Sequence, residues 1–343
     1  MDMIKLDRDI KSQPRLFSLH RSKILSIPEK IISQTQGTNV IFTGIATSLS
    51  ALKGAYYLLN MQKKNHVQLI NTCDLLDYWY PQEEEDCPLV IVSRSGESAE
   101  IHRLLHTVTD KRNIIGVTEC SNSILAKKSS CLLDFEAGEQ AFPNTASFTI
   151  SQLYALAIVV GLGYRTSVSF DELLGQLCHL SESVLGMEEQ ADEIGKMIAG
   201  SSGIIIEGQG YLTGIVEQYA QDYHETQTFG IPVVGGVMRH GAIELTEKED
   251  VMTLLLIPDD HTAERKFALA EELWKNGKKV VILTDKTPMI DNQIPMLRLP
   301  KSPIEISSVL FTLGMQQIFS GFVKAKGLMD LQPSLVGKVT RRE

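Results

Sequence analysis

Short apolar runs alternate with helix-like segments along this chain, and this alternation limits the possible folds more than any other feature. Each run has the length of a strand, and the segment after it carries apolar residues three or four positions apart, as on one face of a helix. Strands and helices in alternation form parallel sheets covered by helices, so we predict an α/β fold of the flavodoxin-like or Rossmann-like kind. The predicted strands are 39–43, 67–70, 88–92, 113–117 and 131–135, followed by 203–207, 252–257, 278–283 and 296–299. The predicted helices are 48–63, 98–109, 146–164, 211–226, 261–275 and 303–325.

The same cycle of elements occurs twice, which predicts duplicated halves. Thr43-Gly44-Ile45 and Glu207-Gly208-Gln209-Gly210 each end the first strand of a half with glycine, just before a helix. A chain of 343 residues is long enough for two domains that each bury a core. The expected parts are a helical segment over 1–25, a first domain over 26–168, a helical connector over 169–197, a second domain over 198–327 and a tail over 328–343.

One loop of the first half is suited to holding an anion. It follows the predicted strand 88–92 and reads Ser93-Arg94-Ser95-Gly96-Glu97-Ser98, with a helix period directly after it. The free N–H groups and positive dipole end of a helix start attract anions, the three serines add hydroxyl donors, and Gly96 lets the backbone approach a ligand closely. We therefore predict that Ser93, Ser95, Gly96 and Ser98 bind a phosphate monoester. An ordinary turn with a serine N-cap remains the alternative, because the loop matches neither a P-loop nor a GxGxxG fingerprint.

The matching position of the second half has different chemistry. It reads Ile257-Pro258-Asp259-Asp260-His261. Two carboxylates would repel a phosphate, so we expect only the first half to keep an anion site.

The overall composition excludes several classes of protein. A net charge of −9 argues against a nucleic-acid partner. We find no apolar run of the roughly 20 residues that a membrane span needs and no signal peptide at the start, so we expect a cytoplasmic protein without a membrane partner. The five cysteines are scattered and never in CxxC spacing, which fits free thiols. No cluster with metal-ligand spacing is visible, and we expect neither a metal nor a cofactor.

Further motifs follow the same order as in a known family. They are Asp9-Ile10-Lys11-Ser12-Gln13-Pro14, Gly44-Ile45-Ala46-Thr47-Ser48, the segment from Glu139 to Gln152, Arg239-His240-Gly241-Ala242-Ile243, and the tail from Lys326 to Pro333 with Leu335 and Lys338. Together with the serine loop, they resemble the sugar isomerase (SIS) domain family nearly end to end. The resemblance is strongest to the isomerase half of glucosamine-6-phosphate synthase and to its stand-alone relatives, the agaS-type isomerases and fructosamine-6-phosphate deglycases. It implies two tandem SIS-type domains.

This chain departs from the family pattern at two positions and at its start. Ala242 replaces the usual proline, and Ala146 leaves the family's Thr-Lys pair incomplete, which puts contacts to the far end of the sugar in doubt. The chain starts at the isomerase segment and its first cysteine is Cys73, so we expect no glutaminase domain of the synthase kind.

The resemblance implies roles for particular residues. Glu225 matches the base that moves a proton between C1 and C2, work that suits a partly buried carboxylate with a raised pKa. His240 matches the histidine that opens the sugar ring and reaches in from the neighbouring subunit, and Lys338 matches the tail lysine that closes over the sugar. The remaining expected contacts to the substrate are Thr47, Ser48, Arg94 and Glu139.

Each of these roles has a simpler alternative. Glu225 would otherwise be a solvated residue at a helix end, His240 a structural histidine, and Lys338 a solvated tail residue. Arg94 faces either the phosphate or solvent. His224 is the second choice as proton carrier, and the residues expected at the surface are His102 and His106.

The expected function is therefore that of a phosphosugar isomerase-type enzyme. Its substrates would be amino-sugar or fructosamine 6-phosphates, isomerised with or without loss of ammonia, or deglycated, through an enediol or enolamine. A homodimer is expected because the His240 loop would be shared. The alternatives are a non-catalytic phosphosugar sensor and a binding subunit whose catalytic residues have drifted.

Overall fold

The protein folds into two compact units, each built on one parallel sheet. The structure, a computed structural model, describes residues 4–35, 39–63, 67–79, 87–108, 113–138, 140–247, 250–288, 290, 293–328 and 339–341. The N-terminal sheet unit comprises Leu16–Glu139, Ala146–Asp171 and Gln332–Glu343. The C-terminal sheet unit comprises Met1–Arg15, Gln140–Thr145 and Glu172–Leu331. The units are thus interleaved in sequence, and the domain boundaries expected above remain a prediction.

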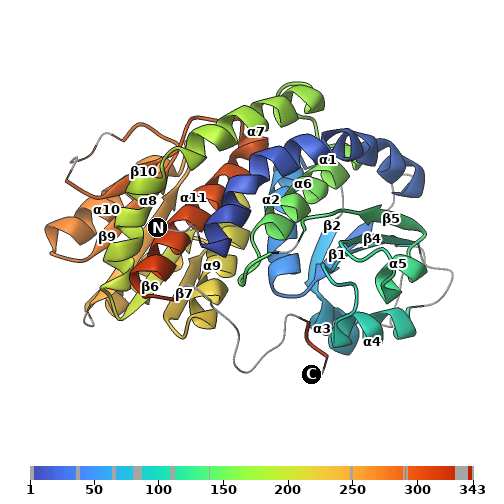
Figure 1. Ribbon diagram of the computed structural model, residues 1–343, viewed down its shortest axis with the longest axis horizontal. Coiled ribbons are helices and arrows are strands. Elements are labelled where there is room, and N and C mark those ends of the chain that lie inside the picture. The colour runs from blue at the N-terminus through green and yellow to red at the C-terminus, as the bar shows by residue number, and fades with distance from the viewer. Residues whose placement is uncertain are drawn as a thin grey trace. The chain divides into compact units, whose positions relative to one another are not determined.

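The sheet of the N-terminal unit has five parallel strands in the order β2-β1-β3-β4-β5 (Figure 1). The strands are β1 (Val40–Gly44), β2 (Val67–Asn71), β3 (Leu89–Val92), β4 (Ile114–Thr118) and β5 (Cys131–Asp134). The helices are α1 (Lys5–Thr35), α2 (Thr47–Met61), α3 (Thr72–Asp74), α4 (Ala99–Thr107), α5 (Ile124–Lys128) and α6 (Ala146–Gly161), with a π-helical turn, Leu75–Trp79, after α3. β3 and β4 lie inside the sheet and are buried along their whole length, which explains their continuous apolar sequence.

Helices cover this sheet and bury its apolar side chains. One cluster joins α4 and α5 to the strands beneath them, with Ile101 and Leu104 of α4 packed against Leu89 and Ile91 of β3. α2 packs against α6, and α6 is buried on nearly all sides. This burial explains why α6 is apolar all round rather than amphipathic.

The C-terminal sheet unit repeats the topology of the first. Its strands are β6 (Gly203–Gly208), β7 (Phe229–Val234), β8 (Val251–Ile257), β9 (Val280–Thr284) and β10 (Met296–Arg298), in the order β10-β9-β8-β6-β7. Its helices are α7 (Phe170–Leu185), α8 (Glu188–Ala199), α9 (Thr213–Glu225), α10 (Ala263–Lys275) and α11 (Ile304–Ala325), with 3-10 turns η2 (Gly210–Leu212), η3 (Val237–Arg239) and η4 (Ala242–Glu247). In each sheet the first strand lies between the second and the third. The predicted duplication and the α/β fold with two parallel sheets are therefore confirmed.

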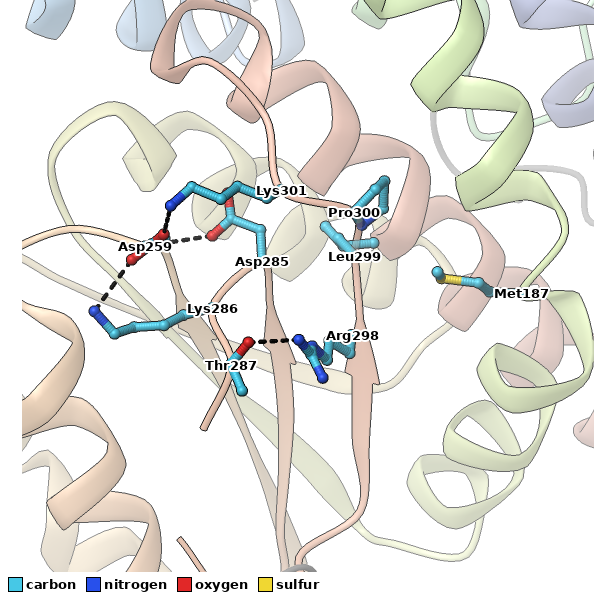
Figure 2. Close-up of a pocket in the computed structure, with 9 residues that line it drawn as sticks. All are labelled: Met187, Asp259, Asp285, Lys286, Thr287, Arg298, Leu299, Pro300 and Lys301. Carbon is cyan, nitrogen blue, oxygen red and sulfur yellow. Dashed lines mark hydrogen bonds and ion pairs between the residues drawn. The ribbon is translucent and has the colours of Figure 1, made fainter. Parts of the chain in front are cut away.

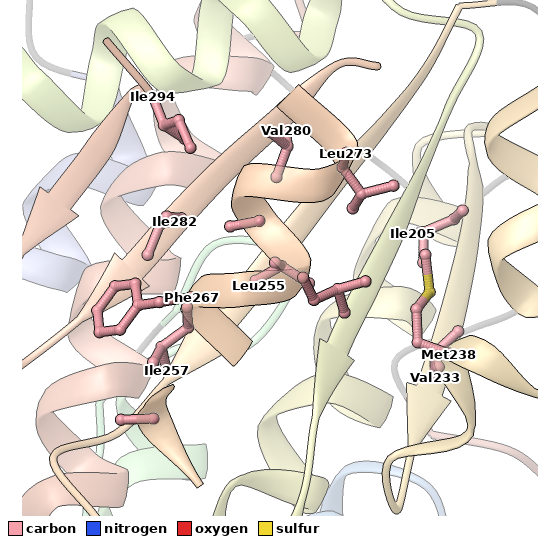
Figure 3. Packing of buried hydrophobic residues seen from close by; sticks show 13 residues of the cluster. Ile205, Val233, Met238, Leu255, Ile257, Phe267, Leu273, Val280, Ile282 and Ile294 are labelled. Carbon is pink, nitrogen blue, oxygen red and sulfur yellow. The ribbon is translucent and has the colours of Figure 1, made fainter. Parts of the chain in front are cut away.

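The two faces of the C-terminal sheet have separate cores. On one face, α10 and Met238 of η3 pack on strand residues such as Ile205, Leu255 and Ile282 (Figure 3). Elsewhere in this unit, Tyr223 of α9 packs edge-on against Phe319 and Phe322 of α11, with ring centroids 5.2 and 4.9 Å apart. Because strand–helix–strand crossovers are right-handed, α9 covers the face opposite to α10.

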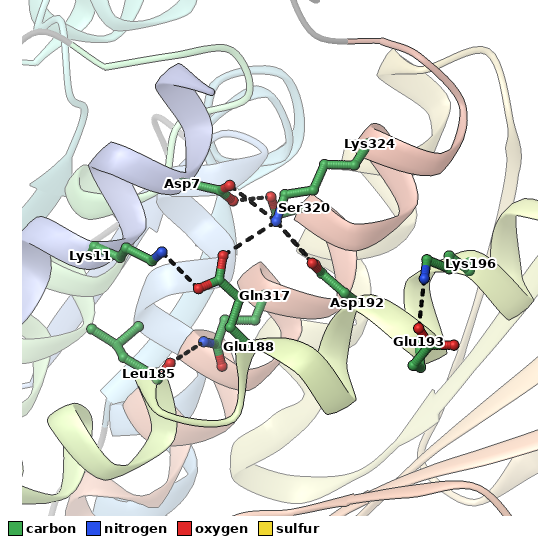
Figure 4. Close-up of polar contacts among 10 residues, drawn as sticks. All are labelled: Asp7, Lys11, Leu185, Glu188, Asp192, Glu193, Lys196, Gln317, Ser320 and Lys324. Carbon is green, nitrogen blue, oxygen red and sulfur yellow. Dashed lines mark hydrogen bonds and ion pairs between the residues drawn. The ribbon is translucent and has the colours of Figure 1, made fainter. Parts of the chain in front are cut away.

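A charged cluster joins the start of α1 to α8 and α11. The Lys324 amine lies 3.0 Å from Asp7, 3.1 Å from Asp192 and 3.4 Å from Glu188, as Figure 4 shows. Ser320 also donates to Asp7. Three carboxylates around one partly buried ammonium hold the first turns of α1 on the end of α11.

Two features of the fold differ from the sequence-based expectations. β7 was not predicted. The segment expected as a helical connector, 169–197, contains the helices α7 and α8, separated at Gly186 and Met187, and its role as a connector stays a prediction. The expectation that no apolar segment reaches the length of a membrane span is wrong for α11, which is long and apolar enough by length and composition. Its most apolar stretch is completely buried in the C-terminal sheet unit, where it is the central core helix.

Candidate active site

The serine loop lies at the point where the strand order of the first sheet reverses. β1 pairs with β2 on one side and with β3 on the other, with Thr43 opposite both Ile70 and Ile91. The loops after β1 and β3 therefore leave the same edge of the sheet in opposite directions. In open parallel sheets of this order, the crevice between those loops is where ligands bind. The two segments expected to hold the phosphate, one with Thr47 and Ser48 and one with Ser93–Ser98, are these two loops.

The serine hydroxyls of the loop keep their protons available. Ser93 Oγ accepts a hydrogen bond from the Gly96 N–H at 3.1 Å, and Ser95 Oγ accepts one from the Glu97 N–H at 3.2 Å. Ser98 is the N-cap residue of α4, yet its side chain makes no capping bond. A hydroxyl that accepts from the backbone can still donate its own proton to an anion. The N–H groups of Ser95 and Ser98 also donate to no acceptor among the described residues.

The neighbouring loop fixes the shape of the serine loop. The Arg94 carbonyl accepts from both the Glu119 N–H and Thr118 Oγ1 at 3.0 Å. Gly96 has φ +62°, and a Cβ at this position would lie 2.2 Å from Ser123 Oγ. Only glycine fits this left-handed conformation and close approach. The Arg94 carbonyl is thus turned toward the neighbouring loop, which leaves the N–H groups of Ser95 and Ser98 and the serine hydroxyls for a ligand.

The described end of the chain lies at the same helix start. The Thr340 carbonyl accepts a hydrogen bond from the N–H of Ala99, the first residue of α4, at 3.0 Å. The tail over 328–343 was expected to close on the site, and this contact places its residues 339–341 beside the serine loop. Lys338 itself lies outside the described residues.

The other expected substrate contacts are half-buried. Thr47 and Ser48 begin α2, behind Ala46, whose φ of +49° is unusual for a residue other than glycine. Arg94 is also half-buried. Glu139 lies outside the described residues. These positions fit a ligand site, and their roles stay predictions.

Glu225 has the environment of a general base. It ends α9, is half-buried, and its Oε2 atom is enclosed without a hydrogen-bond partner among the described residues. Burial raises the pKa of this carboxyl from its ordinary 4.5 to about 7, although a hydrogen bond from Gln221 acts in the other direction. A carboxylate that changes charge near neutral pH can take a proton from carbon and give it back.

A second carboxyl, which the sequence did not suggest, lies one helical turn before Glu225. Asp222 is buried, and its Oδ1 atom accepts a hydrogen bond from Gln218 at 2.8 Å. Burial, and next the charge of Glu225, raise the pKa of Asp222 well above its ordinary value. Burial thus disfavours a second negative charge beside the candidate base. Only the spacing of Asp222, three residues from Glu225, could have signalled it, and that spacing is common on helix surfaces.

The two candidate histidines differ in their surroundings. The imidazole of His224 bonds to the Gly230 carbonyl at 2.7 Å, which is a structural role at the turn into β7. His240 follows η3, is exposed, and makes no side-chain hydrogen bond with the described residues. Val237 and Leu245 beside it are exposed apolar residues, at 46% and 38%.

Glu225 and His240 follow elements that pack on opposite faces of the second sheet. Met238 of η3, two residues before His240, belongs to the core on the α10 face. Tyr223 of α9, the helix that Glu225 ends, packs on Phe319 and Phe322 on the other face.

The acidic counterpart loop of the second half is less negative than its sequence indicated. Asp259 lies between two lysines, 3.1 Å from Lys286 and 2.8 Å from Lys301 (Figure 2). The three residues line a cavity of about 430 Å³ that also contains Arg298. The hydrogen bonds from both lysines lower the pKa of Asp259. Repulsion by Asp259 is thus offset, and the absence of a second anion site stays a prediction.

The motif near the start of the chain has a structural role in the C-terminal sheet unit. Gln13 is fully buried and donates to Gln316 of α11 at 2.5 Å, and Gln316 in turn donates to the Thr145 carbonyl. Asp9 accepts from the Ala141 N–H. These bonds hold the segment over 140–145 on α1 and α11.

No metal site is visible in the described ranges of the chain, where no three His, Cys, Asp or Glu side chains are placed to hold an ion.

Comparison with known proteins supports the family resemblance expected from the sequence. The family model described as "SIS domain" matches residues 35–160, which confirms the expected resemblance for that part. A probable glutamine–fructose-6-phosphate aminotransferase (isomerizing) of Schizosaccharomyces pombe is 26% identical over 75% of this chain, and the match covers 38% of that relative. The chain thus spans less than half the length of this relative.

Solved structures show the same fold. The C-terminal domain of glucosamine-fructose-6-phosphate aminotransferase from Francisella tularensis has a TM-score of 0.82 at 17% identity, covering 95% of this chain and 97% of that domain. A glucosamine-6-phosphate deaminase from Thermotoga maritima has a TM-score of 0.74 at 18% identity, covering 98% of this chain and 100% of the other.

Proposed function

We propose that this chain, which carries an SIS domain over residues 35–160, is an enzyme that isomerises, deaminates or deglycates amino-sugar or fructosamine 6-phosphates. The observation that carries the proposal is Glu225, a half-buried carboxyl with an unpartnered oxygen and a pKa of about 7. A protein that only binds phosphosugars does not need a carboxyl whose pKa is raised to near neutral pH. The names of the aligned proteins, an isomerizing aminotransferase and a deaminase, support the same chemistry.

The serine loop would hold the substrate by its phosphate. Ser93, Ser95 and Ser98 can donate their hydroxyl protons, and the N–H groups of Ser95 and Ser98 add two more donors. Thr47 and Ser48 would contribute from the start of α2, and Arg94 and Glu139 are further proposed contacts. Hydrogen bonds to a charged group contribute about 1.5–3 kcal/mol each, so this loop would supply much of the binding energy.

Glu225 would move the proton. As the anion, it takes the proton from the carbon beside the carbonyl or imine while the oxygen or nitrogen of that group takes up a proton from solvent, which gives an enediol or enolamine. The protonated carboxyl then returns its proton to the neighbouring carbon while the hydroxyl or amino group on the first carbon releases a proton to solvent, so isomerisation is complete without gain or loss of atoms. Burial raises the pKa of Asp222, one turn away, which disfavours a second negative charge at that site.

Release of an amine follows from the same intermediate. When the substrate carries nitrogen, the enolamine takes up a proton at carbon and releases its N–H proton, which gives an imine. Water adds to the imine carbon, and the carbon–nitrogen bond breaks with transfer of a proton to nitrogen. The products are a sugar phosphate and ammonia or a larger amine.

The site would be completed by a second subunit. Glu225 ends α9 and His240 follows η3, two elements that pack on opposite faces of their sheet, and His240 is exposed together with Val237 and Leu245. A homodimer in which His240 reaches the partner's Glu225 site accounts for both facts. His240 would then open the sugar ring, and Lys338 of the tail would close over the sugar.

A substrate panel tests the proposal. Hexose, hexosamine and fructosamine 6-phosphates are incubated with the protein, and isomers, ammonia and free amine are measured. We expect turnover of at least one 6-phosphate and of none of the unphosphorylated sugars. The double variant Ser95→Ala/Ser98→Ala should lose affinity in calorimetry by at least tenfold, about 1.4 kcal/mol. Binding without turnover by any member of the panel would favour the alternative, a non-catalytic phosphosugar sensor.

A further inference from the structure

We propose that Glu97 and His102 are positioning residues that hold the serine loop in its phosphate-binding shape. The inference rests on the proposed function, because it concerns the same phosphate site. It assigns a role to a carboxylate that lies inside an anion-binding loop, where a negative charge would otherwise oppose the ligand.

Glu97 uses both carboxylate oxygens to tie the loop to other elements. Oε1 accepts a hydrogen bond from the N–H of Ile124, the first residue of α5, at 2.7 Å. Oε2 lies 2.8 Å from Nε2 of His102, on the first turns of α4. Glu97 thus connects the serine loop to the loop after β4 and to the helix that follows it.

Other contacts also join the serine loop to the start of α5. The Leu125 N–H donates to the Gly96 carbonyl at 3.3 Å, next to the Glu97–Ile124 bond. Gly96 itself packs directly on Ser123. The start of α5 is therefore the surface against which the serine loop is shaped, and Glu97 is the side chain that fastens the two together.

The pairing also removes the electrostatic objection to a glutamate here. The hydrogen bond from His102, and next that from Ile124, lower the pKa of Glu97, so the carboxyl stays ionised. Its charge is directed at the histidine and at a backbone N–H. Without these partners the carboxylate would be free to turn toward the phosphate and repel it.

The test separates substrate affinity from turnover. Glu97→Ala should raise KM and the calorimetric Kd for the best 6-phosphate substrate by at least about tenfold and leave kcat within twofold, because phosphate positioning contributes to binding and Glu225 is untouched. Glu97→Gln keeps an acceptor for the Ile124 N–H, so its KM and Kd should lie between those of the wild type and those of Glu97→Ala. His102→Gln, which keeps a donor, should have a smaller effect than Glu97→Ala.

A matched control is His106→Gln, one turn further along α4 and without a hydrogen bond to the loop; it should bind like the wild type. The double variant Glu97→Ala/His102→Ala should lose no more affinity than Glu97→Ala alone, because the two side chains act as one unit. Independent effects of the two changes would contradict the pairing.

Hydrogen exchange gives a readout that needs no ligand. In Glu97→Ala the Ile124 amide should exchange faster than in the wild type, while amides of β4 keep their rates. Wild-type protein that binds no phosphosugar would overturn the proposed function. Wild-type binding that Glu97→Ala leaves within twofold, or an unchanged Ile124 amide, would overturn the positioning role alone.

Discussion

Replacing Glu225 by glutamine should stabilise the protein and abolish its activity. Burial favours the protonated carboxyl, so the folded protein holds this proton up to a pH of about 7, whereas the unfolded chain releases it near 4.5. Between these values the unfolded state binds fewer protons than the folded state, so the stability of the wild type falls as the pH rises. A rise of the pKa from 4.5 to about 7 corresponds to roughly 3 kcal/mol. Glutamine has no proton to hold and avoids this loss.

The assay is urea unfolding of wild type and Glu225→Gln at pH 4 and pH 8. The difference in the free energy of unfolding between the two proteins should be larger at pH 8 than at pH 4 by up to roughly 3 kcal/mol. Comparing two pH values removes any constant effect of the amide itself. The matching activity measurement is the pH dependence of kcat/KM in the wild type, which should rise with a midpoint near 7 as the base ionises. An equal difference at both pH values would refute the assigned environment of Glu225.

Three other changes test the surrounding structure. Gly96→Ala should destabilise the protein by about 2–4 kcal/mol and weaken phosphosugar binding, because the alanine Cβ would clash with Ser123 and the backbone there is left-handed. The control is Gly138→Ala, where φ is +75° but the space for a Cβ is open; it should lose only about 1 kcal/mol in urea unfolding. Lys324→Ala should destabilise the protein by about 2–3 kcal/mol, because Asp7 and Asp192 lose their shared cation. The control is Lys196→Ala, which removes the exposed ion pair with Glu193. An equal fall in the unfolding midpoint of both variants would contradict this reasoning. Asp222→Asn should be more stable than the wild type by an amount that grows as the pH rises above about 4, since burial raises the pKa of this carboxyl in the folded state. A pH-independent difference in thermal unfolding would contradict this raised pKa.

The sequence predicted the fold well where apolar periodicity and burial agree. β3, β4 and β8 are buried strands in the interior of their sheets, and their continuous apolar runs were visible in the sequence. β7 was missed because it is an edge strand that contains Pro232 and begins with Phe229, which is 78% exposed. A proline and an exposed face remove both signals by which a strand is recognised.

The site could be predicted in part. Ser93–Ser98 are local in sequence, so a strand, a glycine and a helix start identified them as an anion loop. The partners of that loop could not be foreseen, because Ile124 and Thr340 meet it only through the packing of the fold. His102, expected to be a simple surface residue, is 41% exposed in its side chain yet pairs with Glu97. Asp222 was missed because the sequence does not show which face of α9 is buried.

The central claim, that Glu225 moves a proton between neighbouring carbons of a phosphosugar, is tested most directly by hydrogen exchange with solvent. Ketose and amino-sugar 6-phosphates are incubated in D₂O with wild type or Glu225→Gln, and deuterium at the carbons next to the carbonyl is followed by NMR. The account predicts incorporation with the wild type, and none with Glu225→Gln although calorimetry shows that the variant still binds the phosphosugar. Comparable incorporation with Glu225→Gln would contradict it.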